Sequence, residues 1–195
     1  MYKLEGLEGG RLKILDSDIA IKPLDKSDRE IDRLAESYCL TFIGESFSKQ
    51  DVDETAVNLS KHTDYPGFRG FKAVDGDGSI AGFAYGYTSV PGQYYREKIQ
   101  AQLTKEQEVV WLISCFEVVE VAVNPLFRRK GIAGNLLDKL IGNQPHRTAL
   151  LTTGIENKAA IEFYQNRGWE MLQNNSPVIS EGDLQIIYGL NLEEE

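Results

Sequence analysis

The chain has 195 residues, of which 42% are hydrophobic and 10% aromatic, so it is long enough to bury a substantial core. We therefore predict a single domain over 1–195. The formal net charge of −9 argues against nucleic acid and anionic membranes as partners, because both attract clustered Lys and Arg.

The first elements are predicted from residue spacing. Residues 1–17 are Gly-rich and mixed in charge, which predicts an extra N-terminal strand or a loose arm, and a short strand follows over 18–24. Ser27 and Glu30 form a capping-box pattern. Apolar residues at helical spacing then predict an amphipathic helix over 28–43.

A second helix and a hairpin come next. Apolar residues at helical spacing over 52–59 hint at the helix, and two strands are predicted over 68–74 and 80–88. The turn that joins them, 75–79, begins like a calcium loop. It lacks the glycine and the carboxylate that such a loop needs at its sixth and twelfth positions, so we interpret it as a hairpin turn.

The second half of the chain alternates between helical and strand patterns. The predicted elements are a helix over 93–107, a strand over 111–123, a helix over 131–142, a strand over 148–153, a helix over 157–167, and strands over 169–173 and 184–192. Helices between strands predict an α/β (α+β) fold with a mixed central sheet that is covered on both faces.

The cysteines and the apolar runs bear on metal binding and location. Cys39 and Cys115 lie in apolar sequence and are predicted to be reduced thiols. Together with His62 and His146 they lack the paired, short spacing of a zinc site, so we predict no metal. No secretory signal pattern opens the chain and no run reaches about 20 apolar residues, which predicts a cytoplasmic protein without a membrane span.

The segment 121–134 carries the clearest chemical pattern. A β-branched strand ends at Pro125, the basic loop 128–130 follows, and Gly131 and Gly134 open an amphipathic helix. Small residues let backbone N–H groups approach a ligand, and the first helical turn supplies unpaired donors and the positive end of the helix dipole. This predicts a pyrophosphate cradle, and the spellings of a P-loop and of a dinucleotide-binding loop are absent.

Two motifs resemble one known family. The run Arg128-Arg-Lys-Gly131-Ile-Ala133 resembles the Q/R-x-x-G-x-G/A signature of the GNAT superfamily of N-acetyltransferases, and a V-x-V strand end precedes it. The segment 157–169 resembles the N-x-x-A-x-x-F-Y-x-x-x-G-F helix and turn of the same family. The resemblance is strongest over 115–173. It implies the GNAT fold, with about six to seven strands splayed at the site of the cosubstrate acetyl-CoA.

The resemblance also implies which residues hold the cosubstrate. Backbone groups at the strand end would bind the pantetheine arm, the loop and helix start would hold the pyrophosphate, and an asparagine would touch the arm. The residues implied are Val121, Ala122, Val123, Arg128, Arg129, Lys130, Gly131, Ile132, Ala133, Gly134 and Asn157. Asn157 is also a candidate helix N-cap. Tyr164 would lie near the thioester sulfur as the acid, the alternative being a core aromatic.

The strand before the loop offers two candidate bases. An amine with a pKa near 10.4 arrives protonated at neutral pH, so a carboxylate must accept its proton. Strand alternation predicts that Glu117 and Glu120 face opposite sides of the sheet, with Glu117 on the face of Val121 and Val123. Glu117 lies where histone-acetylating relatives place their base, and Glu120 lies where many small-molecule members carry an acid. We favour Glu120, and either one could instead be a paired structural carboxylate.

The resulting hypothesis is an acyltransferase that moves an acetyl group from acetyl-CoA to a primary amine of a small molecule. The alternatives are a protein or peptide N-acetyltransferase and a non-catalytic CoA-binding sensor. The resemblance implies acceptor contacts from about 40–66 and 90–112, and a possible homodimer. Four aromatics are candidates for an acceptor pocket or for the core: Tyr87, Tyr94, Tyr95 and Trp111.

Overall fold

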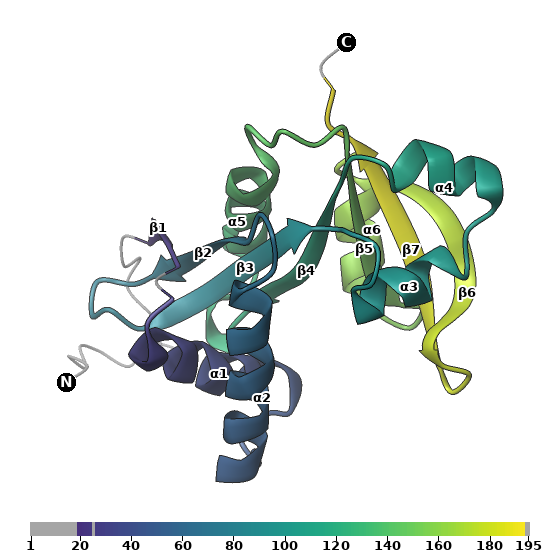
Figure 1. The fold of residues 1–195 in the computed structure, drawn as a ribbon. Helices are drawn as coiled ribbons and strands as arrows, with labels where there is room; N and C mark the ends of the chain where they lie inside the picture. The colour runs from purple at the N-terminus through teal and green to yellow at the C-terminus, as the bar shows by residue number, and fades with distance from the viewer. Residues whose placement is uncertain (1–18, 25, 194–195) are drawn as a thin grey trace.

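The computed structural model describes residues 19–24 and 26–193, so the predicted arm or strand over 1–17 lies outside the described residues (Figure 1). The elements in chain order are β1 (Ala20–Pro23), α1 (Asp28–Phe42), α2 (Lys49–Thr63), β2 (Arg69–Val74), β3 (Ile80–Thr88), α3 (Tyr94–Gln100), α4 (Lys105–Trp111), β4 (Cys115–Val123), the 3-10 turn η1 (Pro125–Phe127), α5 (Ile132–Ile141), β5 (Thr148–Gly154), α6 (Lys158–Gln165), β6 (Glu170–Ser180) and β7 (Asp183–Asn191).

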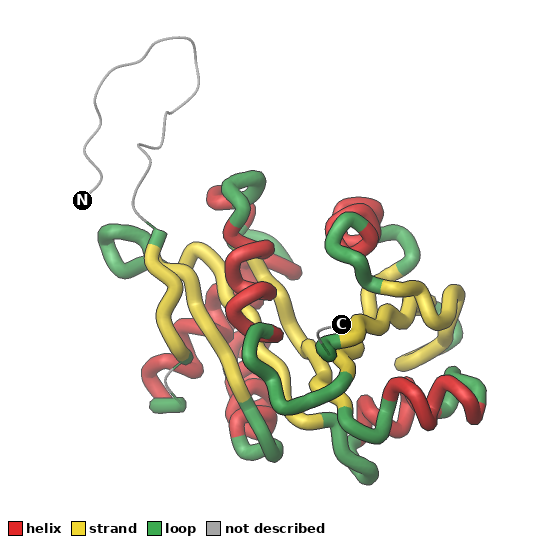
Figure 2. Tube along the Cα trace, turned by 90° about the horizontal axis from the view of Figure 1, so that it is seen from above, coloured by secondary structure: helices red, strands yellow, loops and turns green. Residues whose placement is uncertain are grey.

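The strands form one mixed sheet in the order β1-β2-β3-β4-β5-β7-β6. Only the β4–β5 pair is parallel among the described strands, and the other neighbours run antiparallel. Helices α5 and α6 contribute to the core on one face, while α1, α2, α3 and α4 pack on the other (Figure 2). The predicted mixed sheet with helices on both faces is confirmed.

The sheet opens between β4 and β5. Their ladder runs only from Cys115 opposite Thr148 to Glu117 opposite Leu150. Beyond this point β5 remains paired with β7 as far as Gly154, and β4 remains paired with β3, so the two strands diverge (Figure 1). The opening divides the sheet into an N-terminal half, β1–β4, and a C-terminal half, β5–β7.

The strand β4 contains a bulge on its other side. Tyr85 of β3 lies opposite Glu120, whereas the next residue, Gly86, lies opposite Val118, so Val119 has no partner on β3. A Cβ atom at Gly86 would lie 2.3 Å from the main-chain oxygen of Glu117. The glycine therefore permits the close approach of the two backbones beside the bulge.

Two predicted elements have different boundaries in the structure. The helix predicted over 93–107 is two helices, because Thr104 forms a capping box with Gln107 that begins α4. The strand predicted over 111–123 begins only at Cys115. Trp111 instead ends α4 and is buried in the core between α4 and the C-terminal half of the sheet.

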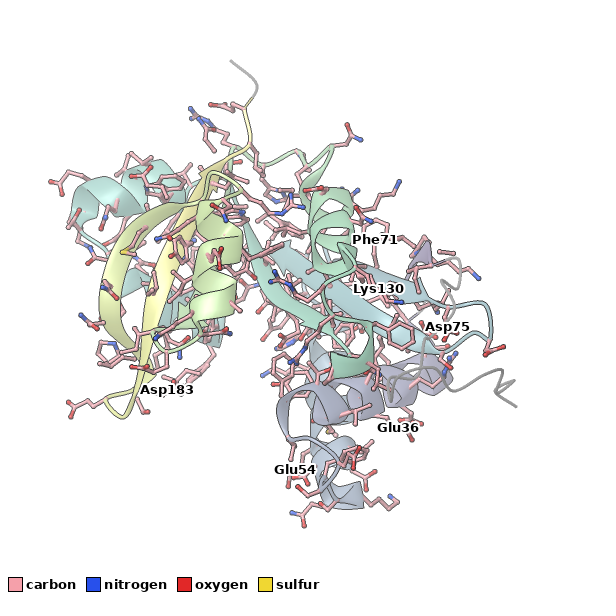
Figure 3. The ribbon with its side chains drawn as sticks, turned by 180° about the vertical axis from the view of Figure 1, so that it is seen from behind. Glu36, Glu54, Phe71, Asp75, Lys130 and Asp183 are labelled. Atoms are coloured by element: carbon pink, nitrogen blue, oxygen red, sulfur yellow. The ribbon has the colours of Figure 1, made fainter. Side chains whose placement is uncertain are left out.

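Smaller features also differ from the predictions. The capping box expected at Ser27 does not form within the described residues, because the Glu30 carboxylate pairs with Lys72. The hairpin turn is confirmed, since β2 and β3 pair antiparallel on either side of it, where Figure 3 labels Asp75. The Asp75 side chain accepts hydrogen bonds from the N–H groups of Asp77 and Ser79. Strand β6 extends seven residues past the predicted end at 173, because it pairs with β7 as a long hairpin. No helix of the described chain is long and apolar enough to cross a membrane.

Candidate active site

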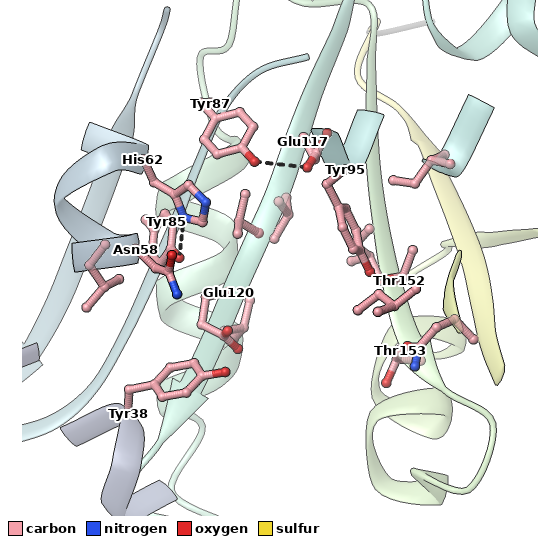
Figure 4. A pocket seen from close by; sticks show the side chains of 18 of the residues that line it. Tyr38, Asn58, His62, Tyr85, Tyr87, Tyr95, Glu117, Glu120, Thr152 and Thr153 are labelled. Atoms are coloured by element: carbon pink, nitrogen blue, oxygen red, sulfur yellow. Dashed lines mark hydrogen bonds between the residues drawn. The ribbon is translucent and has the colours of Figure 1, made fainter. Parts of the chain in front are cut away.

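A cavity of about 650 Å³ lies where the two halves of the sheet diverge (Figure 4). Strand β4 forms its floor. Residues of α1, α2 and β3 line one side, and residues of α3, β5 and α6 line the other. Because the cavity lies beside the open edge of β4, it brings the candidate bases together with most of the predicted acceptor segments.

Glu117 and Glu120 both face this cavity (Figure 4). Glu117 lies opposite Tyr87 and Glu120 opposite Tyr85 on β3. Because Tyr85 and Tyr87 are two residues apart, their side chains share a face, and so do the side chains of their partners. The unpaired Val119 supplies the extra residue that makes this possible on β4.

The prediction that the two carboxylates lie on opposite faces is therefore wrong. Strict alternation fails at the bulge, which shifts the parity of every residue after it. Val121 and Val123 pack on the core beneath α5, away from the face of Glu117. An isolated glycine inside a strand is the sequence signal that could have indicated the bulge, and Gly86 is such a residue.

Glu117 is the more enclosed of the two carboxylates, with 2% of its surface exposed. The Tyr87 hydroxyl donates to its Oε1 at 3.2 Å, and the Ser89 hydroxyl donates to its Oε2 at 3.3 Å. Burial raises the pKa of Glu117 to about 7, although these donors and the nearby Arg96 act in the opposite direction. Its oxygens are thus already engaged by neighbouring side chains.

Glu120 lies farther along β4, next to the segment predicted to hold the cosubstrate. The Tyr38 and Tyr85 side chains line the cavity around it (Figure 4). Tyr164 lines the cavity from α6. Burial raises the pKa of Glu120 to about 8, and the N–H of Val121 only partly offsets this shift. A carboxyl with a pKa near neutrality can accept and release a proton at working pH.

An aromatic wall, formed by residues of α2, the turn after it and β3, flanks the two carboxylates. His62 of α2 places Nδ1 3.0 Å from the Tyr85 hydroxyl, and burial lowers the pKa of the imidazole. Its ring centroid lies 5.6 Å from those of Tyr65 and Tyr87, and these two rings meet edge to face at 4.8 Å. On the opposite side, Tyr95 is fixed by a 2.6 Å contact of its hydroxyl with Thr152.

The candidate aromatics divide between cavity and core. Tyr87, Tyr94 and Tyr95 line the cavity, whereas Trp111 does not. Sequence reasoning missed Tyr38 as a cavity residue and assigned His62 only to the metal question. Amphipathic spacing predicts the helices that contain Tyr38 and His62, but it does not predict which of their side chains reach the cavity. Within the described residues, no group of three or more His, Cys, Asp or Glu could hold a metal ion.

Tyr164 and Asn157 reach the cavity from α6 and its N-cap. Tyr164 is buried, with its ring 5.1 Å from that of Phe163 and 5.7 Å from that of Trp169. Burial and the charge of Glu120 raise the pKa of its hydroxyl, which keeps it protonated. The predicted N-cap is confirmed, because the Asn157 side chain accepts a hydrogen bond of 3.2 Å from the N–H of Ala160.

The basic loop leads from the end of β4 into α5. Arg129 and Gly131 have positive φ angles of 64° and 76°, which turn the exposed loop onto the helix start. The first N–H groups of α5, from Ile132 to Gly134, have no acceptor within the helix itself. The donors of the helix start, the helix dipole and three exposed cations therefore lie close together along the chain.

The strand end before this loop has one open edge. Val121, Ala122 and Val123 pair with β3, and among the described strands none pairs with them on the side of β5. Alternate main-chain N–H and C=O groups on that side can bind an extended ligand as an added strand. The open edge lies between the loop and the cavity.

The sequence is similar to a known protein family and to one named relative. The family model described as Acetyltransferase (GNAT) family matches residues 31–169. A protein of Methanocaldococcus jannaschii, named as an uncharacterized N-acetyltransferase, is 42% identical over 57 residues, or 28% of this chain and 25% of that protein. The matched segment thus spans about a quarter of the length of that relative.

Solved structures resemble the whole described fold. A GNAT-family protein from Desulfovibrio desulfuricans has a TM-score of 0.65 and 16% identity, covering 90% of this chain and 99% of its own. A protein from Salmonella typhimurium, solved with its cofactor acetyl-CoA, has a TM-score of 0.63 and 16% identity, covering 91% of this chain and 95% of its own. At these identities the likeness shows a shared fold.

Proposed function

The chain belongs to the acetyltransferase (GNAT) family, because its residues 31–169 match the family model. We propose that it transfers an acetyl group from acetyl-CoA to a primary amine of a small molecule. One observation carries the proposal. The open edge of β4 and a carboxyl with a pKa of about 8 adjoin a single cavity, and the same strand leads through the basic loop to the N-terminus of α5.

The residues present fit acetyl-CoA. The N–H donors at the start of α5 suit a pyrophosphate, and Arg128, Arg129 and Lys130 add positive charge to an otherwise acidic chain. The open edge over 121–123 suits the amide groups of a pantetheine arm. When bound there, acetyl-CoA supplies an acyl thioester for an amine to attack. Asn157 lines the same cavity, and its proposed role is to contact that arm.

Glu120 is the proposed base. The ammonium of the acceptor must lose a proton before its nitrogen can form the new N–C bond, and the Glu120 carboxylate accepts this proton. Glu117 is less suited, because Tyr87 and Ser89 already donate to both of its oxygens. Its proposed role is to hold Tyr87 in the cavity wall.

Tyr164 is the proposed acid. As the thioester C–S bond breaks, the departing sulfur needs a proton, and the hydroxyl of Tyr164 donates it. The contacts with Phe163 and Trp169 hold the ring in position. The raised pKa of the Tyr164 hydroxyl keeps it protonated until the C–S bond breaks. The ammonium loses two protons on the way to the amide. Glu120 takes the first and later releases it to solvent, and the second, lost by the nitrogen once the N–C bond has formed, replaces the proton that Tyr164 gives to the sulfur.

The test combines binding with turnover. Acetyl-CoA is titrated into the protein by calorimetry, and thiol release is then followed with primary amines, amino acids and peptides. Binding together with acetylation of a small amine, identified by mass spectrometry, supports the proposal. Absence of acetyl-CoA binding contradicts it, and binding without turnover on any acceptor favours the CoA-binding sensor instead.

A further inference from the structure

The ionisable groups on the floor of the cavity are both acidic. Glu117 and Glu120 lie on its floor, and Lys61 is the one Lys or Arg among the described lining residues. Lys61 belongs to the exposed side of α2. Once Glu120 is ionised, an acceptor with a carboxylate beside its amine would bring a like charge toward it, whereas an ammonium alone is attracted. The buried cation Arg96 acts on Glu117 but does not line the cavity.

Aromatic side chains on both sides of the carboxylates are held in place. The hydroxyls of Tyr85, Tyr87 and Tyr95 contact His62, Glu117 and Thr152 respectively. These contacts fix the rings before any acceptor arrives, so little side-chain entropy is lost on binding. Aromatic rings attract a cation through their quadrupole and also pack against an apolar body.

The mouth of the cavity carries exposed apolar side chains from three separate elements. Phe42 of α1 is 52% exposed, Tyr94 of α3 is 62% exposed, and Ile179 of β6 is 53% exposed. All three line the cavity. An acceptor with an apolar body would cover this surface while its charged end points toward Glu120.

We propose that the acceptor is an amphipathic amine: a primary ammonium with no carboxylate on its carbon, joined to an aromatic or alkyl body. This inference rests on the proposed function and narrows its substrate class. The ammonium lies between the aromatic wall and Glu120, and the body extends toward Phe42 and Tyr94 at the mouth.

Matched acceptors test the charge requirement. Initial rates are measured with phenethylamine, phenylalanine and phenylalanine amide, which share one aromatic body. We expect kcat/KM for phenethylamine to exceed that for phenylalanine about 100-fold, and the uncharged amide to recover most of the difference. Equal use of phenylalanine overturns the inference, as does an amide that is as poor as phenylalanine, because the barrier would then be steric.

Rim variants test the apolar body. The double variant Phe42→Ser with Tyr94→Ser is expected to raise KM for phenethylamine about 10-fold with little change in kcat, and to leave KM for methylamine unchanged. Val57→Ser is the matched control, since Val57 is an exposed apolar residue of α2 that does not line the cavity.

The outcomes separate this inference from the proposed function. Acetyl transfer to amino acids or peptides in preference to phenethylamine overturns the inference while supporting an acetyltransferase. An unchanged KM for phenethylamine in the rim variant, with the melting temperature preserved, overturns the role of the mouth. If none of the acceptors supports thiol release, the proposed function itself is contradicted.

Discussion

Glu117 and Glu120 share one face of β4, although strict alternation would separate them, because Val119 between them has no partner on β3. The two carboxyls therefore adjoin one cavity but have different surroundings. Tyr87 and Ser89 donate to Glu117, where the ladder with β5 ends, whereas Glu120 lies within the open edge of β4. Their contributions to activity and to stability are expected to separate.

Replacing Glu120 tests its role as the base. We expect Glu120→Gln to lower kcat about 100-fold, because the amide cannot take the proton of the ammonium. The affinity for acetyl-CoA, measured by calorimetry, is expected to stay within about twofold. Glu117→Gln is the comparison, with a smaller loss in kcat. A larger loss in Glu117→Gln than in Glu120→Gln would reverse the assignment.

The pKa of Glu120 predicts a pH profile. A base with a pKa of about 8 is protonated at lower pH, so kcat/KM is expected to rise with pH and level off above about 8. The measurement is a series of initial rates from pH 6 to 9.5 with one amine. In Glu120→Gln the step near pH 8 is expected to vanish, while any rise due to the amine itself, nearer pH 10, remains. A wild-type profile without that step argues against Glu120.

The stability of the fold is expected to fall as the pH rises, because of Glu117, whereas kcat/KM is expected to rise. Its pKa of about 7 lies above the value near 4.3 of an unfolded glutamate, so the folded state holds a proton that the unfolded state releases. The resulting stabilisation is complete below about pH 4 and is lost as the pH rises through about 7. Urea titrations from pH 4.5 to 8 are expected to show a smaller loss of stability in Glu117→Gln than in wild type.

An exposed carboxylate provides the control for that experiment. Glu106 lies on the surface of α4, and Glu106→Gln is expected to keep the wild-type slope of stability against pH. If Glu117→Gln and Glu106→Gln gave the same slope, burial of Glu117 would not be the source of the pH dependence.

Removing one oxygen from Tyr164 tests the acid. We expect Tyr164→Phe to lower kcat about 10- to 100-fold, since the phenyl ring keeps its contacts with Phe163 and Trp169 but cannot donate a proton. The melting temperature and the affinity for acetyl-CoA are measured alongside. A variant with unchanged kcat would leave Tyr164 as a core aromatic only.

The loop before α5 is tested by a backbone substitution. Gly131 has a φ of 76°, which a residue with a side chain adopts at a cost, so Gly131→Ala is expected to distort the loop and raise the Kd for acetyl-CoA about 10-fold. Gly78 has a φ of 81° in the β2–β3 turn and is equally unobstructed. Gly78→Ala is thus expected to lower stability comparably without changing the Kd, and an equal change in both variants would contradict a specific role for the loop.

Local patterns account for most of the fold that could be predicted. The loop and helix around Gly131, and the helix that carries Tyr164, follow from contiguous motifs and spacing, and their predicted elements agree with α5 and α6. The break between α3 and α4 also has a local cause, the Thr104 capping box. It was missed because apolar residues at helical spacing continue across the break and predict a single helix. Elements defined by neighbours in sequence are the ones that sequence reasoning finds.

The cavity depends on relationships that no local pattern contains. Glu117 receives its hydrogen bond from Tyr87, which is 30 residues away, and His62 meets Tyr85 across 23 residues. The bulge at Val119 is a property of the pairing between two strands, so alternation along β4 alone predicted the wrong face. The pair of carboxylates therefore became visible only in three dimensions.

The short ladder between β4 and β5 also has a mechanical consequence. Three residue pairs, ending at Glu117 and Leu150, provide the strand-to-strand connection between the two halves of the sheet, so these halves are joined as if by a hinge at one end. A ligand bound along the open edge of β4 would connect the two halves and restrict their relative motion. Amide hydrogen exchange over 118–123 is then expected to slow when acetyl-CoA binds, and the molecule as a whole to become stiffer.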